Sequence, residues 1–147
     1  MIAKKCQEAT KRKFKNLMAG YAFMTGHPGK KLLFMGQDFG QHREWSEERE
    51  LDWFLLEKEP NHQLQLFVKE LLHLYKSNKC LYEYDCWPEG FEWINADDGD
   101  RSIFSFVRHS ASGKNNMLFV INFTPVERPD YRVGTTCRRK SYSCTEQ

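Results

Sequence analysis

The unbroken apolar run LLFM at residues 32–35 constrains the fold more than any other feature of the sequence. Because the run does not alternate with polar residues, both of its faces need cover, which predicts a buried strand of a parallel sheet between helices. A polar and aromatic loop follows at residues 36–60. Loops of that length after a buried strand are often functional, because binding residues gather on them.

Two helices are predicted on either side of this strand and loop. Residues 7–25 and 61–77 repeat apolar positions at helical spacing, with one buried stripe on each helix. Gly26 and Pro28 are expected to end the first helix, and Asn61 to cap the second. A short helical turn capped by Ser46 is expected within the loop. Helix, strand, loop and helix in this order form an αβα unit of a barrel or a doubly wound sheet.

The second half of the sequence changes to strand periodicity. Strands are predicted near residues 90–95, 102–108 and 117–123, joined by Asp-Gly and Ser-Gly-Lys-Asn turns, with a fourth short strand possible near 131–133. A domain boundary is expected between about residues 79 and 88. Neither half is complete, since one parallel strand and a short meander both need neighbours. The sequence reads as cut from a larger protein.

Composition excludes several classes of function. The net charge of the 147 residues is only +2, so no global charge favours a nucleic-acid or membrane partner. The five cysteines form no CxxC pair and the five histidines are scattered, so we predict free thiols, no metal and no cofactor. No apolar run approaches the length of a signal peptide or a membrane span. These features predict a soluble, cytoplasmic protein.

Four segments carry a resemblance to a known family. They are GHPGKKLLFMGQDFGQHREW, ELDWFLL, GFEWI and INFTPVERPDYRVG. Over about residues 13–140 the sequence resembles the bacterial-type 1,4-α-glucan (glycogen) branching enzymes of the α-amylase superfamily. The resemblance implies that residues 1–78 are the carboxy-terminal end of a catalytic (β/α)8 barrel. It also implies that residues 79–147 begin an antiparallel β-sandwich.

The resemblance also implies a reaction whose catalytic residues lie elsewhere. Branching enzymes cut an α-1,4 linkage and transfer the released chain to a 6-hydroxyl, through a carboxylate nucleophile and a carboxylic acid. In the family these carboxylates follow the fourth, fifth and seventh barrel strands, upstream of the segment resembled here. The expected partners are therefore an α-glucan and the missing amino-terminal part of the enzyme, and this chain alone is predicted to be inactive.

The loop after the predicted strand contains residues suited to contact a glucan. Indole rings stack on the apolar face of a pyranose, while amides and carboxylates bind its hydroxyls. The candidates for substrate binding are Gln37, Asp38, Gln41, Trp45, Asp52 and Trp53. The competing interpretation is structural: Asp38 and Arg43 would hold the loop, and Trp53 would pack a helix. Family members more often have Glu at the position of Asp38, and the shorter side chain weakens a role there.

The same loop is rich in carboxylates, which raises the alternative that it is itself catalytic. The acidic residues are Asp38, Glu44, Glu47, Glu48, Glu50 and Asp52. A general acid needs a pKa raised by burial or by a close like charge, and a solvated first turn of helix provides neither. Outside the loop, Trp87, Phe91 and Trp93 could form an outlying glucan site, although packing between domains explains them as well.

Two further functions remain open from the sequence. The chain could be a noncatalytic α-glucan-binding module. It could instead be an interaction protein whose basic first helix, with Lys11, Arg12 and Lys13, grips an acidic partner. Exposed apolar surface on an incomplete fold also predicts association or poor solubility. If all four side chains of residues 32–35 faced solvent, or lay on a helix, the barrel assignment and the glucan interpretation would both be undone.

Overall fold

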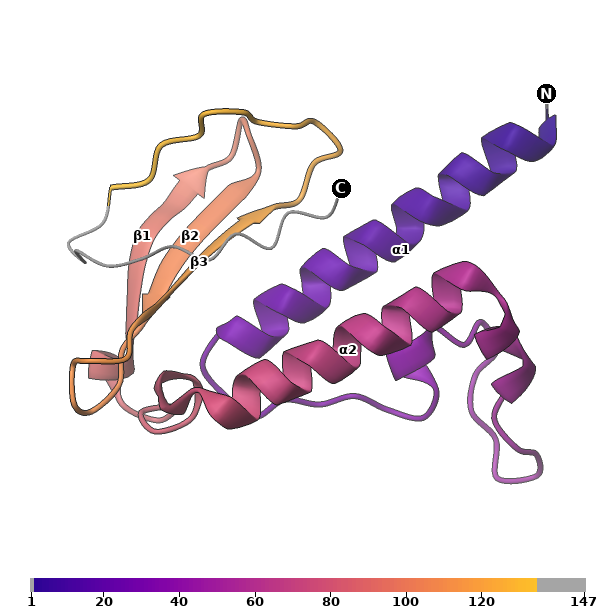
Figure 1. Cartoon of the computed structure of the whole chain (residues 1–147), viewed down its shortest axis with the longest axis horizontal. Helices are drawn as coiled ribbons and strands as arrows, with labels where there is room; N and C mark the ends of the chain where they lie inside the picture. The colour runs from indigo at the N-terminus through magenta and orange to yellow at the C-terminus, as the bar shows by residue number, and fades with distance from the viewer. Residues whose placement is uncertain (1, 135–147) are drawn as a thin grey trace.

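The computed structural model describes residues 2–134, with side chains from residue 10 onward. Two helices, α1 (Ile2–Gly26) and α2 (Glu59–Ser77), are followed by a sheet of β1 (Phe91–Asp98), β2 (Ile103–Arg108) and β3 (Met117–Asn122). The short 3-10 helices are η1 (Gln37–Phe39), η2 (Trp53–Glu57), η3 (Lys79–Leu81) and η4 (Pro88–Gly90). In Figure 1, α1 and α2 run side by side in the same direction, and residues 27–58 lead the chain from the end of α1 back to the start of α2. Both predicted helices are confirmed.

The two helices pack through a small apolar core. Phe14 of α1 meets Leu64 and Val68 of α2, and Leu17, Met18, Tyr21 and Leu33 pack against this cluster. Helix α2 begins earlier than predicted, with Pro in its first turn, where a missing N–H costs nothing. Lys58 rather than Asn61 precedes it. Asn61 is instead buried and donates from Nδ2 to the carbonyl oxygen of Phe39 at 2.7 Å, so the predicted cap is wrong.

The prediction of a buried strand at residues 32–35 is wrong in this structure. The segment is extended but forms no strand, and the exposed fractions of Leu32, Phe34 and Met35 are 75%, 51% and 50%. Only Leu33 packs against the helical core. An extended segment forms a ladder only beside another strand. Within residues 2–134 every strand belongs to the sheet formed by β1, β2 and β3, so the segment has no neighbour to pair with.

The expected helical turn in the loop is also wrong in detail. Ser46 Oγ accepts a hydrogen bond from the amide of Glu48 at 3.3 Å, which stabilises a turn rather than a helix. The regular element of this region, η2, begins only at Trp53 and contributes the buried side chain of Leu55. The chain between η1 and η2 is therefore a loop that depends on side-chain contacts for its shape.

The antiparallel sheet is confirmed, with strand order β1-β2-β3. Its register pairs Trp93 and Phe119 with Phe106 on the central strand. The sheet lies beside the carboxy-terminal half of α1 in Figure 1, where Phe23 meets the ring of Phe106 edge-on at 5.8 Å. A Cβ at Gly26 would lie 2.7 Å from the ring of Phe119, so the helix approaches the sheet this closely only with glycine there.

Two finer predictions about the second half have different outcomes. Residues 131–133 form no strand, so the possible fourth strand is wrong. The rings of Phe91 and Trp93 lie 5.0 and 6.0 Å from that of His27 at the end of α1, as packing between the two halves predicts. Trp87 remains exposed.

A fully buried arginine joins the two halves of the molecule. Arg108, the last residue of β2, donates to the carbonyl oxygens of Gly26 at 2.8 Å, Leu81 at 3.2 Å and Gly90 at 3.2 Å. It also forms an ion pair of 2.7 Å with Asp85. We call these five residues the Arg108 junction. Because its partners come from the end of α1, the linker and the entry to β1, it fixes the sheet against the helices.

Candidate functional site

The loop between the helices is shaped first by glycine. Gly36 and Gly40 lie on either side of η1 with φ of 76° and 70°, the left-handed region that favours glycine. A Cβ at Gly40 would lie 3.0 Å from the ring of Phe14, so the chain turns tightly against the helical core. Phe39 is fully buried there and anchors the loop, whereas Gln37 is exposed and Asp38 is half-buried.

Two candidate amides are used within the loop. Gln37 Oε1 accepts from the amide of Phe34 at 2.9 Å, and the Gln37 carbonyl accepts from the hydroxyl of Tyr21 at 2.8 Å. Gln41 donates from Nε2 to the carbonyl of Arg43 at 3.0 Å and accepts from the amide of Asp52 at 2.9 Å. These bonds make Gln37 and Gln41 residues that hold the loop in shape.

Asp52 is also a structural partner here. It is buried, and both of its carboxylate oxygens accept from the guanidinium of Arg43. The hydrogen bond from Arg43 lowers the pKa of Asp52, which opposes its use as a general acid. Arg43 therefore holds the loop, as the structural interpretation predicts, and its partner is Asp52.

The two candidate tryptophans remain accessible. The exposed fractions of Trp45 and Trp53 are 41% and 50%. Trp45 meets the ring of Phe34 edge-on at 5.6 Å, and Trp53 lies 5.3 Å from the ring of Phe39. Each indole is thus supported on one side by a phenyl ring and open on another. Rigid, supported aromatic rings are suited to stacking on an apolar ligand surface.

Asp38 lines a groove of about 560 Å³ between the loop and α2. The apolar part of the lining includes Leu33, Phe34, Met35, Leu51, Val68 and Leu72, and the basic part includes Lys69, His73 and Lys76. Neither Trp45 nor Trp53 is among the lining residues. The structure therefore brings Gln37, Gln41 and Asp52 into the framework of the loop, and it leaves Asp38, Trp45 and Trp53 available for contacts.

The carboxylates of the loop do not form an acid–nucleophile pair. Glu44, Glu47, Glu48 and Glu50 are exposed to solvent. Asp52 is bound to Arg43 with a lowered pKa, whereas a general acid at neutral pH needs a raised one. This arrangement argues against catalysis by the loop itself.

Sequence reasoning missed the residues with the most extensive contacts. Arg108 and Asp85 were not singled out, although Arg108 follows Phe104 and Phe106 on one face of a strand by alternation. A charged residue that continues the apolar face of a strand indicates a buried charge with partners, and this pattern could have identified Arg108. Asn61 was assigned to a helix cap because caps are the commonest use of Asn before a helix. Its contact with Phe39 joins residues far apart in the sequence and leaves no local pattern.

The described residues contain neither a cluster of metal ligands nor a membrane-spanning helix. Between residues 2 and 134, no three or more His, Cys, Asp or Glu side chains gather as ligands for a metal ion. In the same part of the chain, neither helix is long and apolar enough to cross a membrane.

The sequence of the chain is similar to one protein family and to several curated proteins. Residues 93–144 match the family described as the alpha amylase C-terminal all-beta domain. The chain is 58% identical over 122 residues to the 1,4-alpha-glucan branching enzyme GlgB of Butyrivibrio fibrisolvens, which covers 83% of the chain and 19% of the relative. It is 52% identical over 123 residues to GlgB of Aquifex aeolicus, covering 84% of the chain and 20% of that enzyme.

A third relative, GlgB of Nitrobacter winogradskyi, is 50% identical over 122 residues, which cover 83% of the chain and 17% of the relative. The chain thus spans about a fifth of the length of the curated relatives that it matches. The matched region is a carboxy-terminal part of those enzymes. The chain is therefore homologous to a carboxy-terminal part of the GlgB 1,4-alpha-glucan branching enzymes.

Proposed function

We propose that this chain is the carboxy-terminal part of a 1,4-α-glucan branching enzyme and acts within that enzyme on α-glucan. The observation that supports this most is the identity of 58% over 122 residues to a named branching enzyme. At this level of identity an unrelated origin is excluded, and the match extends across both halves of the chain. The reaction class, the glucan substrate and a cytoplasmic location belong to this proposal.

The proposal includes a division at about residues 78–79 between the end of a (β/α)8 barrel and the start of a β-sandwich. The parallel direction of α1 and α2, with a segment that returns from the end of α1 to the start of α2, supports the first part (Figure 1). In a barrel, successive helices are parallel and each intervening strand runs back. The exposed side chains at residues 32–35 count against a strand completed by this chain alone, so this placement rests on the helices and the homology.

Within the loop, we assign the glucan contacts to Trp45 and Trp53, with Asp38 as a hydroxyl partner. Both indoles are accessible and backed by phenyl rings, which is the arrangement that a pyranose face needs. Gln37, Gln41 and Asp52 act indirectly, because their polar atoms already hold the loop. This proposal differs from the expectation from the sequence that those three side chains bind the glucan directly.

No carboxylate in this chain is assigned to catalysis. A retaining transfer needs one carboxylate to attack the anomeric carbon and one acid to protonate the leaving oxygen, about 5 Å apart. The loop offers no such pair, and the family's carboxylates follow earlier barrel strands. Branching by the chain alone is therefore expected to be absent.

The test has two measurements that separate the enzyme from the alternative, a noncatalytic glucan-binding module. In the first, the chain is incubated with amylose, alone and together with an upstream part of a homologous branching enzyme, and the iodine colour is followed. The colour should persist with the chain alone and fall when the upstream part is added. Colour loss with the chain alone would refute the absence of catalytic groups.

The second measurement is affinity electrophoresis in gels that contain glycogen. Replacing Trp45 or Trp53 by alanine should weaken retardation about threefold to tenfold, since one stacking contact is lost. Tyr82→Ala is the matched control, because Tyr82 is an exposed aromatic side chain outside the loop. Retardation without restored branching would favour the module, and equal losses in all three variants would remove the loop assignment.

A further inference from the structure

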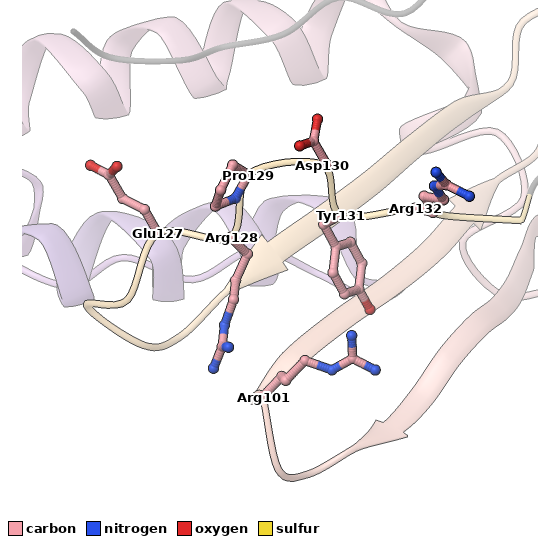
Figure 2. Close-up of a pocket in the computed structure, with 7 residues that line it drawn as sticks. All are labelled: Arg101, Glu127, Arg128, Pro129, Asp130, Tyr131 and Arg132. Carbon is pink, nitrogen blue, oxygen red and sulfur yellow. The ribbon is translucent and has the colours of Figure 1, made fainter.

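An open pocket of about 500 Å³ lies on the sheet, away from the loop between the helices. It is formed where the turn between β1 and β2 meets the segment that follows β3 (Figure 2). Seven residues line it: Arg101, Glu127, Arg128, Pro129, Asp130, Tyr131 and Arg132. Three arginines and two carboxylates are among these residues, and an ion pair with the neighbouring Asp98 balances the charge of Arg101.

One side of the pocket is fixed by a carboxylate. Asp98 accepts from Arg101 Nε at 3.0 Å through one oxygen and from the hydroxyl of Tyr131 at 3.0 Å through the other. The guanidinium carbon of Arg101 also lies 5.5 Å from the centre of the Tyr131 ring. Both oxygens of Asp98 are therefore occupied, and the remaining donors of Arg101 have no recorded partner within residues 2–134.

Arg128 supplies a second guanidinium to the same pocket. The structure records no hydrogen bond or ion pair for its side chain within the described part of the chain. In Figure 2 its side chain and that of Tyr131 extend to one side of the segment. The carboxylates of Glu127 and Asp130 extend to the opposite side. The acidic lining residues therefore leave the charge of Arg128 uncompensated.

We propose that this pocket binds a phosphate monoester or a similar tetrahedral oxyanion through the guanidinium groups of Arg101 and Arg128. Guanidinium forks match the oxygens of phosphate, and a phosphate offers three acceptor oxygens where a carboxylate offers two. Burial and the hydrogen bond to Asp98 raise the pKa of the Tyr131 phenol. The hydroxyl therefore stays neutral and does not repel a bound anion. The same chemistry is presented by a free sugar phosphate and by a phosphate ester on a glucan.

The experiment is calorimetric titration of the purified chain with inorganic phosphate. Saturable binding with a Kd on the order of 1 mM is expected, because the pocket is open and two charge-assisted contacts form. Arg128→Ala should weaken it about tenfold, since one charge-assisted hydrogen-bonding group is lost. Arg128→Lys should weaken it less, because the charge is kept and the fork is lost. Binding should also weaken at high ionic strength.

Lys114→Ala is the matched control, since Lys114 is an exposed cation in the turn between β2 and β3 and lies outside the pocket. Far-UV circular dichroism of each variant verifies that the sheet is intact. Absence of saturable heat with the wild-type chain, or an equal loss in Lys114→Ala and Arg128→Ala, would overturn the proposal.

Further titrations identify the source of the phosphate. Glucose 1-phosphate and a phosphorylated glucan should each compete with inorganic phosphate if they bind in the pocket. The stronger competitor is the ligand that the pocket prefers. Maltose and acetate serve as the neutral and carboxylate controls. Competition by maltose as strong as that by glucose 1-phosphate would show recognition of sugar hydroxyls and would refute an oxyanion site.

Discussion

The Arg108 junction and the groove beside α2 differ in how completely their side chains are covered by the rest of the chain. At the junction, a charged side chain is fully buried and its partners all come from the chain itself. Along the groove, Phe34, Met35 and Leu72 are apolar and at least half exposed. We call these three residues the open face. The contrast teaches that this sequence completes the contact between its halves but not the layer beneath its helices.

The contrast has a direct physical basis. A buried guanidinium without partners is strongly destabilising, so the chain must supply every acceptor for Arg108 itself. An exposed apolar side chain carries no such penalty, because it only forgoes the gain from burial. An apolar surface can therefore stay uncovered at little cost, whereas a buried charge needs its partners within the folded chain.

The largest effect is expected from removing the charge at the junction. Arg108→Met should lower the free energy of unfolding by about 3–5 kcal/mol, because Asp85 and three carbonyl groups lose their partner inside the protein. Urea denaturation followed by tryptophan fluorescence measures the change. Arg128→Met is the control at an exposed arginine and should change stability by about 0.5 kcal/mol or less. Equal effects at the two positions would show that the junction adds no stability.

A smaller loss is expected where the loop is attached to α2. Asn61→Ala should destabilise the protein by about 1–3 kcal/mol, because the buried carbonyl of Phe39 then lacks its donor. The exposed amide of Gln63, which bonds Glu59 within the helix, provides the matched control in Gln63→Ala. Hydrogen exchange at residues 37–41 should increase in Asn61→Ala only. Unchanged exchange there would show that the loop is held by other contacts.

The contact between Arg43 and Asp52 should respond to pH. The pKa of Asp52 is lowered in the folded protein, so its ionised form stabilises the fold above the unfolded-state pKa of about 3.9. That contribution is lost as the pH falls through the lower, folded-state value. The stability difference between the wild type and Asp52→Asn should thus be positive at pH 7 and disappear in acid. A difference that is constant across this range would exclude the ion pair as its source.

The sequence predicted those features of the fold that depend on local periodicity. The apolar stripes of α1 and α2 and the alternation in β1, β2 and β3 gave their positions to within a few residues. It failed at residues 32–35, where a continuous apolar run describes a strand that needs partners outside the described residues. An apolar run of this kind is suited to burial beside neighbouring strands. The described residues form no strand beside it, so its side chains stay largely exposed.

The candidate site shows the same division. Trp45 and Trp53 could be named as candidates from residue type alone, and the structure leaves both indoles accessible. Gln41 and Asp52 have the same chemistry as ligand-binding residues, and only their positions reveal that they bond to each other and to Arg43. Arg108 draws partners from residues 26, 81, 85 and 90, a set that no sequence spacing indicates.

The smallest effect on stability, and the sharpest test of the comparison, is expected at the open face. Phe34→Ser combined with Leu72→Ser should change the free energy of unfolding by only about 0.5 kcal/mol, since both side chains are already exposed. The same change should reduce self-association, because an exposed apolar patch favours contact between copies. Sedimentation velocity over a range of concentrations measures it. A wild-type chain that stays monomeric throughout would mean that this surface needs no cover, and the contrast with the Arg108 junction would then not mark where further structure belongs.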